Sequence, residues 1–263
     1  ADEIFGGYYS YPIWMIFNKI IQIPFSSLLI KFINNFIKNK RLRDYIYMKE
    51  KFGKATFLGT THNVSFDQMK KLFKNKVYFN IFLENIRNPF EKKNDDELLY
   101  YDQNERLPND LLIRADKASM AFGIEARVPY LSIPVLRLTR ELPLTDHIRI
   151  FPYILTKRLI KDISKSLFGN KFTFRKKNGF QLPINKWISN DLKIKFEYFL
   201  KKKYLVNHFN YDFLEDCLNS NKRNIHTSLL WHWLVIEEWY EKWMINSKDS
   251  IEQIKNQKNG MSS

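Results

Sequence analysis

The sequence predicts a predominantly α-helical fold, and three observations support this expectation. The chain of 263 residues is 44% apolar and 16% aromatic, which is enough to bury a substantial core. It contains only 8 glycines and 9 prolines, fewer than turn-dense β-sandwiches or barrels use. Apolar residues also recur at intervals of three and four, the period of an amphipathic helix. We expect one folded domain over residues 1–247 and a polar, disordered tail over residues 248–263.

The first half of the chain contains two predicted helical regions. Apolar residues between positions 13 and 37 predict one or two helices, bent at Pro24. Ser65 is a suitable N-cap for a following helix whose apolar face begins at Phe66. Asn88-Pro89 then predicts a break. Both helical regions are expected to pack against the core.

The densest sequence pattern lies between residues 97 and 131. We expect a helix near residues 97–101, a polar joint, and a second helix that Pro108 initiates. Residues 116–120 continue helically. The chain must then leave the helix before Pro129, because a residue that precedes proline avoids the helical region.

An apolar stripe near the C-terminus predicts a last helix that packs against the core through one face. The stripe comprises Leu229, Trp233, Ile236, Tyr240 and Trp243, whereas His232, Glu237, Glu238, Glu241 and Lys242 fall elsewhere on the helix.

The formal net charge of +15 allows a polyanionic partner or a solvated basic surface. Basic residues are scattered along the chain, and no nucleic-acid-binding signature accompanies them, so we expect a solvated surface and no nucleic acid. Polar residues interrupt the apolar segment 13–37, which excludes membrane insertion but leaves a membrane-surface helix as an alternative to core packing. Cys217 is the only cysteine, which excludes an intrachain disulfide and fits a reducing cytoplasm.

Several common chemistries are excluded by residue spacing. The glycines form neither a Walker phosphate loop nor a GxGxxG turn, and no serine nucleophile elbow is present. The five histidines lack the HExxH spacing of metal hydrolases. Nucleophile-dependent and zinc-dependent hydrolysis are therefore not predicted.

Three charged segments remain as candidates for a site. Asp2-Glu3 precedes Gly6-Gly7, and carboxylates beside such a turn suit magnesium, although an acidic pair at a helix start is an alternative interpretation. Residues 175–180 place three cations before a glycine, which suits a phosphate-covering loop or simply a solvated one. Glu125 and Arg127 lie in a segment apolar enough to be buried, where they would brace the structure or contact a substrate.

Taken in order, these segments resemble the asparagine synthetase family. Residues 2–8 (Asp-Glu-Ile-Phe-Gly-Gly-Tyr) are similar to its acidic DE[LV]FGGY motif. The segments 107–112, 116–121 and 125–131 resemble its central signature. Residues 175–180 with Pro183 and Trp187 resemble its R-x-K-x-G-F-x-x-P-x-x-x-W stretch, and residues 230–239 resemble its last helix.

The resemblance implies a fold and an activity. The chain would be the helical C-terminal part of an α/β adenine-nucleotide α-hydrolase-like (PP-loop ATP pyrophosphatase) domain, with most of the parallel sheet upstream. The parent would be an ATP-dependent amide ligase that adenylates the side-chain carboxylate of aspartate. Ammonia, released from glutamine by a glutaminase domain absent from this chain, would then displace AMP.

The resemblance also implies residue roles. Asp2 would bind Mg²⁺ and pyrophosphate, while Glu3, Gly6 and Gly7 would form the cofactor-binding turn. Lys177 would stabilise charge on the phosphates of ATP, with Glu125 and Arg127 as further catalytic candidates.

This sequence also departs from the family pattern. Ser132 and Lys117 stand where the family has aspartate and arginine, which puts local pairing in doubt. The sequence has no Ser-Gly-Gly-x-Asp-Ser loop for ATP and no N-terminal nucleophilic cysteine. We therefore expect residues 1–263 alone to be inactive in adenylation. Two alternatives stay open: an amidotransferase of the same family acting on a sugar, peptide or β-lactam precursor, and a non-catalytic basic interaction module.

Overall fold

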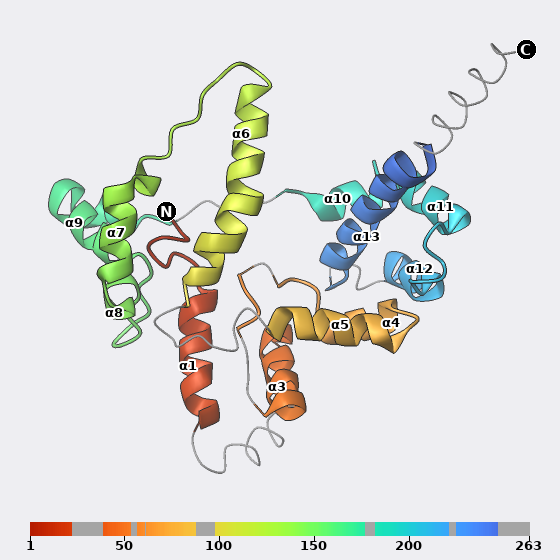
Figure 1. Ribbon diagram of the computed structural model, residues 1–263, viewed down its shortest axis with the longest axis horizontal. Coiled ribbons are helices and arrows are strands. Elements are labelled where there is room, and N and C mark those ends of the chain that lie inside the picture. The colour runs from red at the N-terminus through yellow and green to blue at the C-terminus, as the bar shows by residue number, and fades with distance from the viewer. Residues whose placement is uncertain are drawn as a thin grey trace, which may run out of the picture. The chain divides into compact units, whose positions relative to one another are not determined.

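Helices, joined by turns and loops, are the main secondary structure in the parts of the chain that the computed structural model describes (Figure 1). No β-strand forms among these residues, and isolated bridges join Phe73 to Phe209 and Arg149 to Leu155. The predominantly helical prediction is confirmed. The chain divides into two compact units, residues 1–62 with 84–178 and residues 63–83 with 179–263. The described residues are 1–22, 39–53, 57–60, 62–87, 98–176, 182–220 and 225–246.

The first unit begins with an aromatic cluster around helix α1 (Ser10–Gln22). Trp14 of α1 lies edge-on to Tyr45 of α3 (Lys40–Phe52), with ring centroids 4.8 Å apart. Tyr11 is fully buried and its ring lies 5.8 Å from that of Phe57. The apolar face of α1 therefore packs into the protein, as expected. The predicted bend at Pro24 and the break at Asn88-Pro89 lie outside the described residues.

The polar joint predicted before Pro108 is wrong, because the chain forms one continuous helical stretch there. Residues Asp102–Leu112 (η3) are wound as a π-helix and lead directly into α6 (Ile113–Met120). Proline lacks an N–H and its ring collides with the carbonyl four residues earlier in an α-helix. The wider π-helical turns accommodate Pro108 without ending the helix.

The rest of the first unit packs around the chain's opening turn. The predicted exit from the helix before Pro129 is confirmed, since a loop leads from α6 to the short η4 (Pro129–Leu131) and α7 (Ile133–Glu141) (Figure 1). Helices α8 (Leu144–His147) and α9 (Arg158–Thr173) follow. Ile4, Phe5 and Leu107 form the buried centre, and residues of η3, η4, α7 and α9 pack against it: Leu111, Leu112, Leu131, Val135, Leu136, Leu159 and Ile160.

The second unit is a bundle of short helices. Ser65 caps α4 (Phe66–Leu72) in a capping box with Gln68, which confirms the predicted N-cap. The bundle packs around a core that includes Leu214, Leu230 and Trp233. Its other helices are α5 (Lys76–Arg87), which crosses the boundary between the units, α10 (Ile184–Ser189), α11 (Lys193–Lys202), α12 (Tyr211–Asn219), α13 (Thr227–Tyr240) and the π-helical η6 (Glu241–Ile245).

Helix α13 confirms the predicted stripe in part: Leu229 and Trp233 are buried and Tyr240 packs against the core, but the rest of the stripe is exposed. Ile236 and Trp243 are 41% and 57% exposed, whereas Glu237 is fully buried. The Glu237 carboxylate accepts hydrogen bonds from the Tyr211 hydroxyl and from Trp233 Nε1, the latter at 3.0 Å. Leu230, Leu234 and Glu237 share one helical face, so these two donors allow a carboxyl group to complete an otherwise apolar contact. Among the described helices, none is long and apolar enough to cross a membrane.

Candidate functional site

The acidic motif forms a compact turn before α1. The Phe5 amide donates to the Ala1 carbonyl at 3.0 Å, and the Gly7 amide donates to the Asp2 carbonyl at 2.7 Å. Gly6 has a φ of +65°, a backbone conformation that favours glycine. The turn is fixed from below by the buried side chains of Ile4 and Phe5. This anchoring gives the carboxylate of Asp2 a defined position.

A lysine that the sequence analysis did not identify pairs with Asp2. Lys157 Nζ lies 2.9 Å from Asp2 Oδ1, and the two side chains are 24% and 23% exposed. Both lie directly over Gly7: a Cβ there would stand 2.0 Å from Asp2 Oδ1 and 2.4 Å from Lys157 Cε. Gly7 is therefore required by the ion pair above it.

Lys157 has an unusual backbone conformation at the start of α9. Its φ of 53° and ψ of 43° are left-handed, and it immediately precedes α9. The pKa of Lys161, one turn further along, is lowered by burial and by the charge of Lys157. Two lysine charges are therefore close enough at this end of α9 to influence each other. Within the basic run of this region, no local pattern distinguishes Lys157 from the other lysines.

Glu3 points into the first unit and is buried in a network of polar groups. Its carboxylate accepts a hydrogen bond from the Tyr8 hydroxyl, and Arg106 Nη1 lies 3.9 Å away. The Arg106 guanidinium also stacks over the Tyr8 ring at 4.8 Å. Gln103 Nε2 donates to the Glu3 carbonyl at 3.3 Å. In this geometry Glu3 ties the turn to η3.

Asp102 completes this network and is fully buried. It accepts hydrogen bonds from Tyr11 at 2.5 Å and from Thr60 at 2.8 Å, while Arg106 Nη1 lies 3.9 Å away. Burial raises the pKa of Asp102 above its usual range, and the bonds from Tyr11 and Thr60 oppose this shift. Arg106 is therefore shared by two buried carboxyl groups, Glu3 and Asp102.

The described residues offer a limited metal site. They contain no group of three or more histidine, cysteine, aspartate or glutamate side chains placed to hold a metal ion. Magnesium, however, commonly takes only one or two protein carboxylates and completes its shell with water and phosphate oxygens. Asp2, part-exposed at the turn and paired with Lys157, fits a metal of that kind, held between the turn and a phosphate ligand.

The central signature meets the acidic turn at one end and projects away from it at the other. The ring of Tyr130 lies edge-on to Phe5, with centroids 5.6 Å apart, and Leu131 packs against the core below the turn. Glu125 and Arg127 pair with each other at 2.8 Å, but their side chains are 70% and 80% exposed. The expectation that they are buried is therefore wrong for this chain.

The exposure of Glu125 and Arg127 has a structural cause. The segment's apolar residues also point outward: Phe122 is 83% exposed and Ile124 61%. No residue of α6 is buried. The apolar composition that suggested burial is real, but the first unit does not cover this segment. Lys177, the expected phosphate-covering residue, lies outside the described residues, so its meeting with Asp2 stays a prediction.

Comparison with known proteins identifies the family of the chain. The family model for asparagine synthase matches residues 1–241, most of the chain. This match places the chain in a family of synthetase-type ligases. It belongs to the asparagine synthase family.

We also compared the chain with curated proteins and with solved structures. The chain is 29% identical over 154 residues to asparagine synthetase [glutamine-hydrolyzing] 1 of Bacillus subtilis (strain 168). The alignment covers 55% of this chain and 24% of the relative, so the chain spans about a quarter of that protein's length. No solved structure gives a significant match.

Proposed function

We propose that this chain supplies the pyrophosphate-binding side of the ATP-dependent site of a glutamine-hydrolysing asparagine synthetase. The pair of Asp2 and Lys157 above Gly7 is the observation that carries the proposal. A carboxylate and an ammonium at a glycine turn provide a metal ligand and a phosphate ligand side by side. The family membership of residues 1–241 supports this chemistry.

Each residue then has a role that its position allows. Asp2 would hold Mg²⁺, and Lys157 would contact a phosphate oxygen while balancing the charge of Asp2. Bound Mg²⁺ would neutralise charge on the phosphates of ATP. Glu3 would act by fixing the turn through Tyr8 and Arg106, not by touching the nucleotide.

In the proposed reaction, an oxygen of the aspartate side-chain carboxylate attacks the α-phosphorus of ATP and pyrophosphate leaves. Ammonia then attacks the acyl carbon, and AMP leaves as the amide forms. Lys177 would stabilise the negative charge that develops on the departing pyrophosphate. Glu125 and Arg127 would serve the acceptor side, where their exposure leaves them accessible. We place this activity in the cytoplasm and in a synthetase domain of which residues 1–247 form only a part.

Aspartate-dependent exchange of labelled pyrophosphate into ATP tests this proposal in the gene product that carries the segment. Asp2→Asn and Lys157→Gln should each lower the exchange rate about a hundredfold, the usual cost of losing one charge-stabilising group. Asp162→Asn and Lys165→Gln, at exposed positions of α9 in the same unit, are the matched controls and should leave the rate unchanged. Equal rates in all four variants would contradict the proposed site.

The chain of 263 residues alone should give no exchange, because its sequence contains no loop to hold the ATP phosphates. The identity of the acceptor is tested separately, with aspartate compared with sugar, peptide and β-lactam-precursor carboxylates in the same assay. Exchange that depends on one of these instead of aspartate would assign the chain to a related amidotransferase. Salt-sensitive binding to an anionic surface, with no exchange by the gene product, would instead favour an interaction module.

A further inference from the structure

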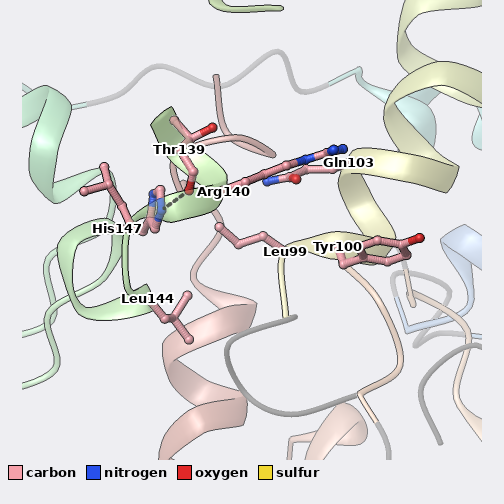
Figure 2. Close-up of a pocket in the computed structure, with 8 residues that line it drawn as sticks. Leu99, Tyr100, Gln103, Thr139, Arg140, Leu144 and His147 are labelled. Carbon is pink, nitrogen blue, oxygen red and sulfur yellow. Dashed lines mark hydrogen bonds between the residues drawn. The ribbon is translucent and has the colours of Figure 1, made fainter. Parts of the chain in front are cut away.

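The first unit contains a small cavity behind the acidic turn. It has a volume of about 250 Å³ and is lined by residues on both sides of a cleft between η3 and α7–α8. Figure 2 shows the Arg140 side chain extending from α7 toward Gln103, with Leu99 and Leu144 below them. The remaining lining residues are Tyr100, Thr139, Leu142 and His147.

The charge of this cavity is positive and resides on Arg140. Among the described residues, Arg140 makes no hydrogen bond, ion pair or ring contact. The described residues that line the cavity include no aspartate or glutamate. His147 is 2% exposed and bonds the Thr139 carbonyl through Nε2 at 3.0 Å, and burial lowers the pKa of its imidazole. The cavity thus offers a planar guanidinium, an amide and a neutral imidazole wall.

The floor of the cavity is apolar. Leu99 and Leu144 are each only 6% exposed, and Leu142 stands beside them. Strongly hydrated anions such as phosphate or sulfate gain nothing from such a floor, because it offers them no hydrogen bonds. An anion with a short hydrocarbon chain would place its charge on Arg140 and its chain on the leucines.

A second pocket beside the cavity also contains Arg140 and could compete as the anion site. It has a volume of about 410 Å³, and its other lining residues are Ile133, Leu136, Arg137 and Glu141. The carboxylate of Glu141 would repel an anion there. No described residue lining the cavity beside Gln103 carries a carboxylate, so that cavity is the better anion site of the two.

We infer that the cavity between η3 and α7–α8 binds a short aliphatic monocarboxylate, with its carboxylate on Arg140 and Gln103. A guanidinium binds a carboxylate through two parallel hydrogen bonds. The volume corresponds to about eight water molecules, which suits a chain of a few carbons. The inference does not depend on the proposed synthetase activity, because it concerns a separate cavity and is tested by binding alone.

Titration of the 263-residue chain with sodium butyrate tests this inference, with chemical shifts followed by NMR at constant ionic strength. We expect saturable binding at one site, with shifts confined to residues 99–103 and 139–147, which line the cavity. Butyrate should bind roughly tenfold more tightly than acetate, since two more methylenes would reach the leucines. Butyramide, which has the same shape without the charge, should bind at least tenfold more weakly.

Two variants on the same helix decide whether Arg140 carries the charge. Arg140→Gln should weaken butyrate binding at least tenfold, whereas Arg137→Gln, which does not line the cavity, should leave it unchanged. Both arginines are exposed, so folding is expected to survive and is checked by circular dichroism. The inference is overturned if butyrate shows no saturable binding, if Arg140→Gln binds as the wild type does, or if inorganic phosphate binds as tightly as butyrate.

Discussion

The acidic turn over residues 2–8 and the exposed segment over residues 121–128 both belong to motifs of one family, yet the first unit treats them in opposite ways. In the turn, Ile4 and Phe5 are buried and Glu3 is bonded to Tyr8. In the exposed segment, Phe122 is 83% exposed and Arg127 bonds only a neighbour two residues away among the described residues.

This difference separates two kinds of motif. The turn is completed by groups of this chain, because burying Glu3 and Asp102 requires the donors that Tyr8, Tyr11 and Arg106 supply. In the exposed segment, apolar side chains and a charged pair both remain open to solvent, which is typical of a surface that serves recognition. Stability and function should therefore respond differently to substitution in the two regions.

The largest expected effect on stability comes from removing the Asp102 carboxylate from the buried network beside the turn. Asp102→Ala should lower the free energy of unfolding by about 4 kcal/mol, because Tyr11 and Arg106 lose a buried carboxylate. Asp110→Ala, which removes an exposed partner of Arg114 on the same helix, should cost less than about 0.5 kcal/mol. Urea unfolding followed by far-UV circular dichroism measures both. Similar costs for the two variants would show that burial does not stabilise the turn.

Two glycines allow the same substitution to be compared in both regions. Gly6 and Gly123 have similar φ values of +65° and +67°, but a Cβ at Gly6 would lie 2.7 Å from Ile148 while one at Gly123 would meet nothing within 4 Å. Gly6→Ala should cost about 3 kcal/mol, from backbone strain and overpacking together. Gly123→Ala should cost about 1 kcal/mol from strain alone. Equal losses in the same unfolding measurement would mean that the turn relaxes as freely as the exposed loop.

The pH dependence of stability tests the buried network without removing its bonds. Burial raises the pKa of Asp102 in the folded chain, so the folded state holds this proton more tightly than the unfolded state does. The stabilisation from protonated Asp102 is complete below its unfolded pKa and is lost as the pH rises through its folded pKa.

Asp102→Asn keeps the size of the side chain and removes this titration. The difference in free energy of unfolding between wild type and variant should therefore shift in favour of the variant as the pH rises above about 4. Unfolding curves collected across this pH range measure it. A difference that stays constant with pH would contradict the raised pKa.

The smallest effect on stability is expected in the exposed segment. Glu125→Gln and Arg127→Gln should each change the free energy of unfolding by less than about 0.5 kcal/mol, since surface ion pairs contribute little. If these residues serve the acceptor side of the proposed site, both variants should nevertheless slow pyrophosphate exchange in the gene product. A large loss of stability from either variant would show that the segment is part of the core.

The sequence by itself determined the helical class, the cap at Ser65, the exit from the helix before Pro129 and the family, because these depend on local chemistry or on motif order. The sequence did not predict the π-helical turns around Pro108. A proline can either break a helix or be accommodated by wider turns, and no residue type indicates which of the two occurs. The sequence predicted that Glu237 lies away from the core. Its burial depends on two hydrogen-bond donors, Trp233 on the same helix and the distant Tyr211, and the second cannot be recognised from local sequence.

The tertiary structure alone decided the site. Lys157 and Asp2 are separated by most of the first unit's sequence, and only the folded backbone brings Nζ and Oδ1 to 2.9 Å. The sequence marked Gly7 as part of a turn, but its necessity follows from the ion pair that lies over it. Arg140 and Gln103 likewise meet only because α7 packs beside η3 around a small cavity. Local patterns encode helix starts and caps, whereas pairing between distant charges depends on packing that those patterns do not specify.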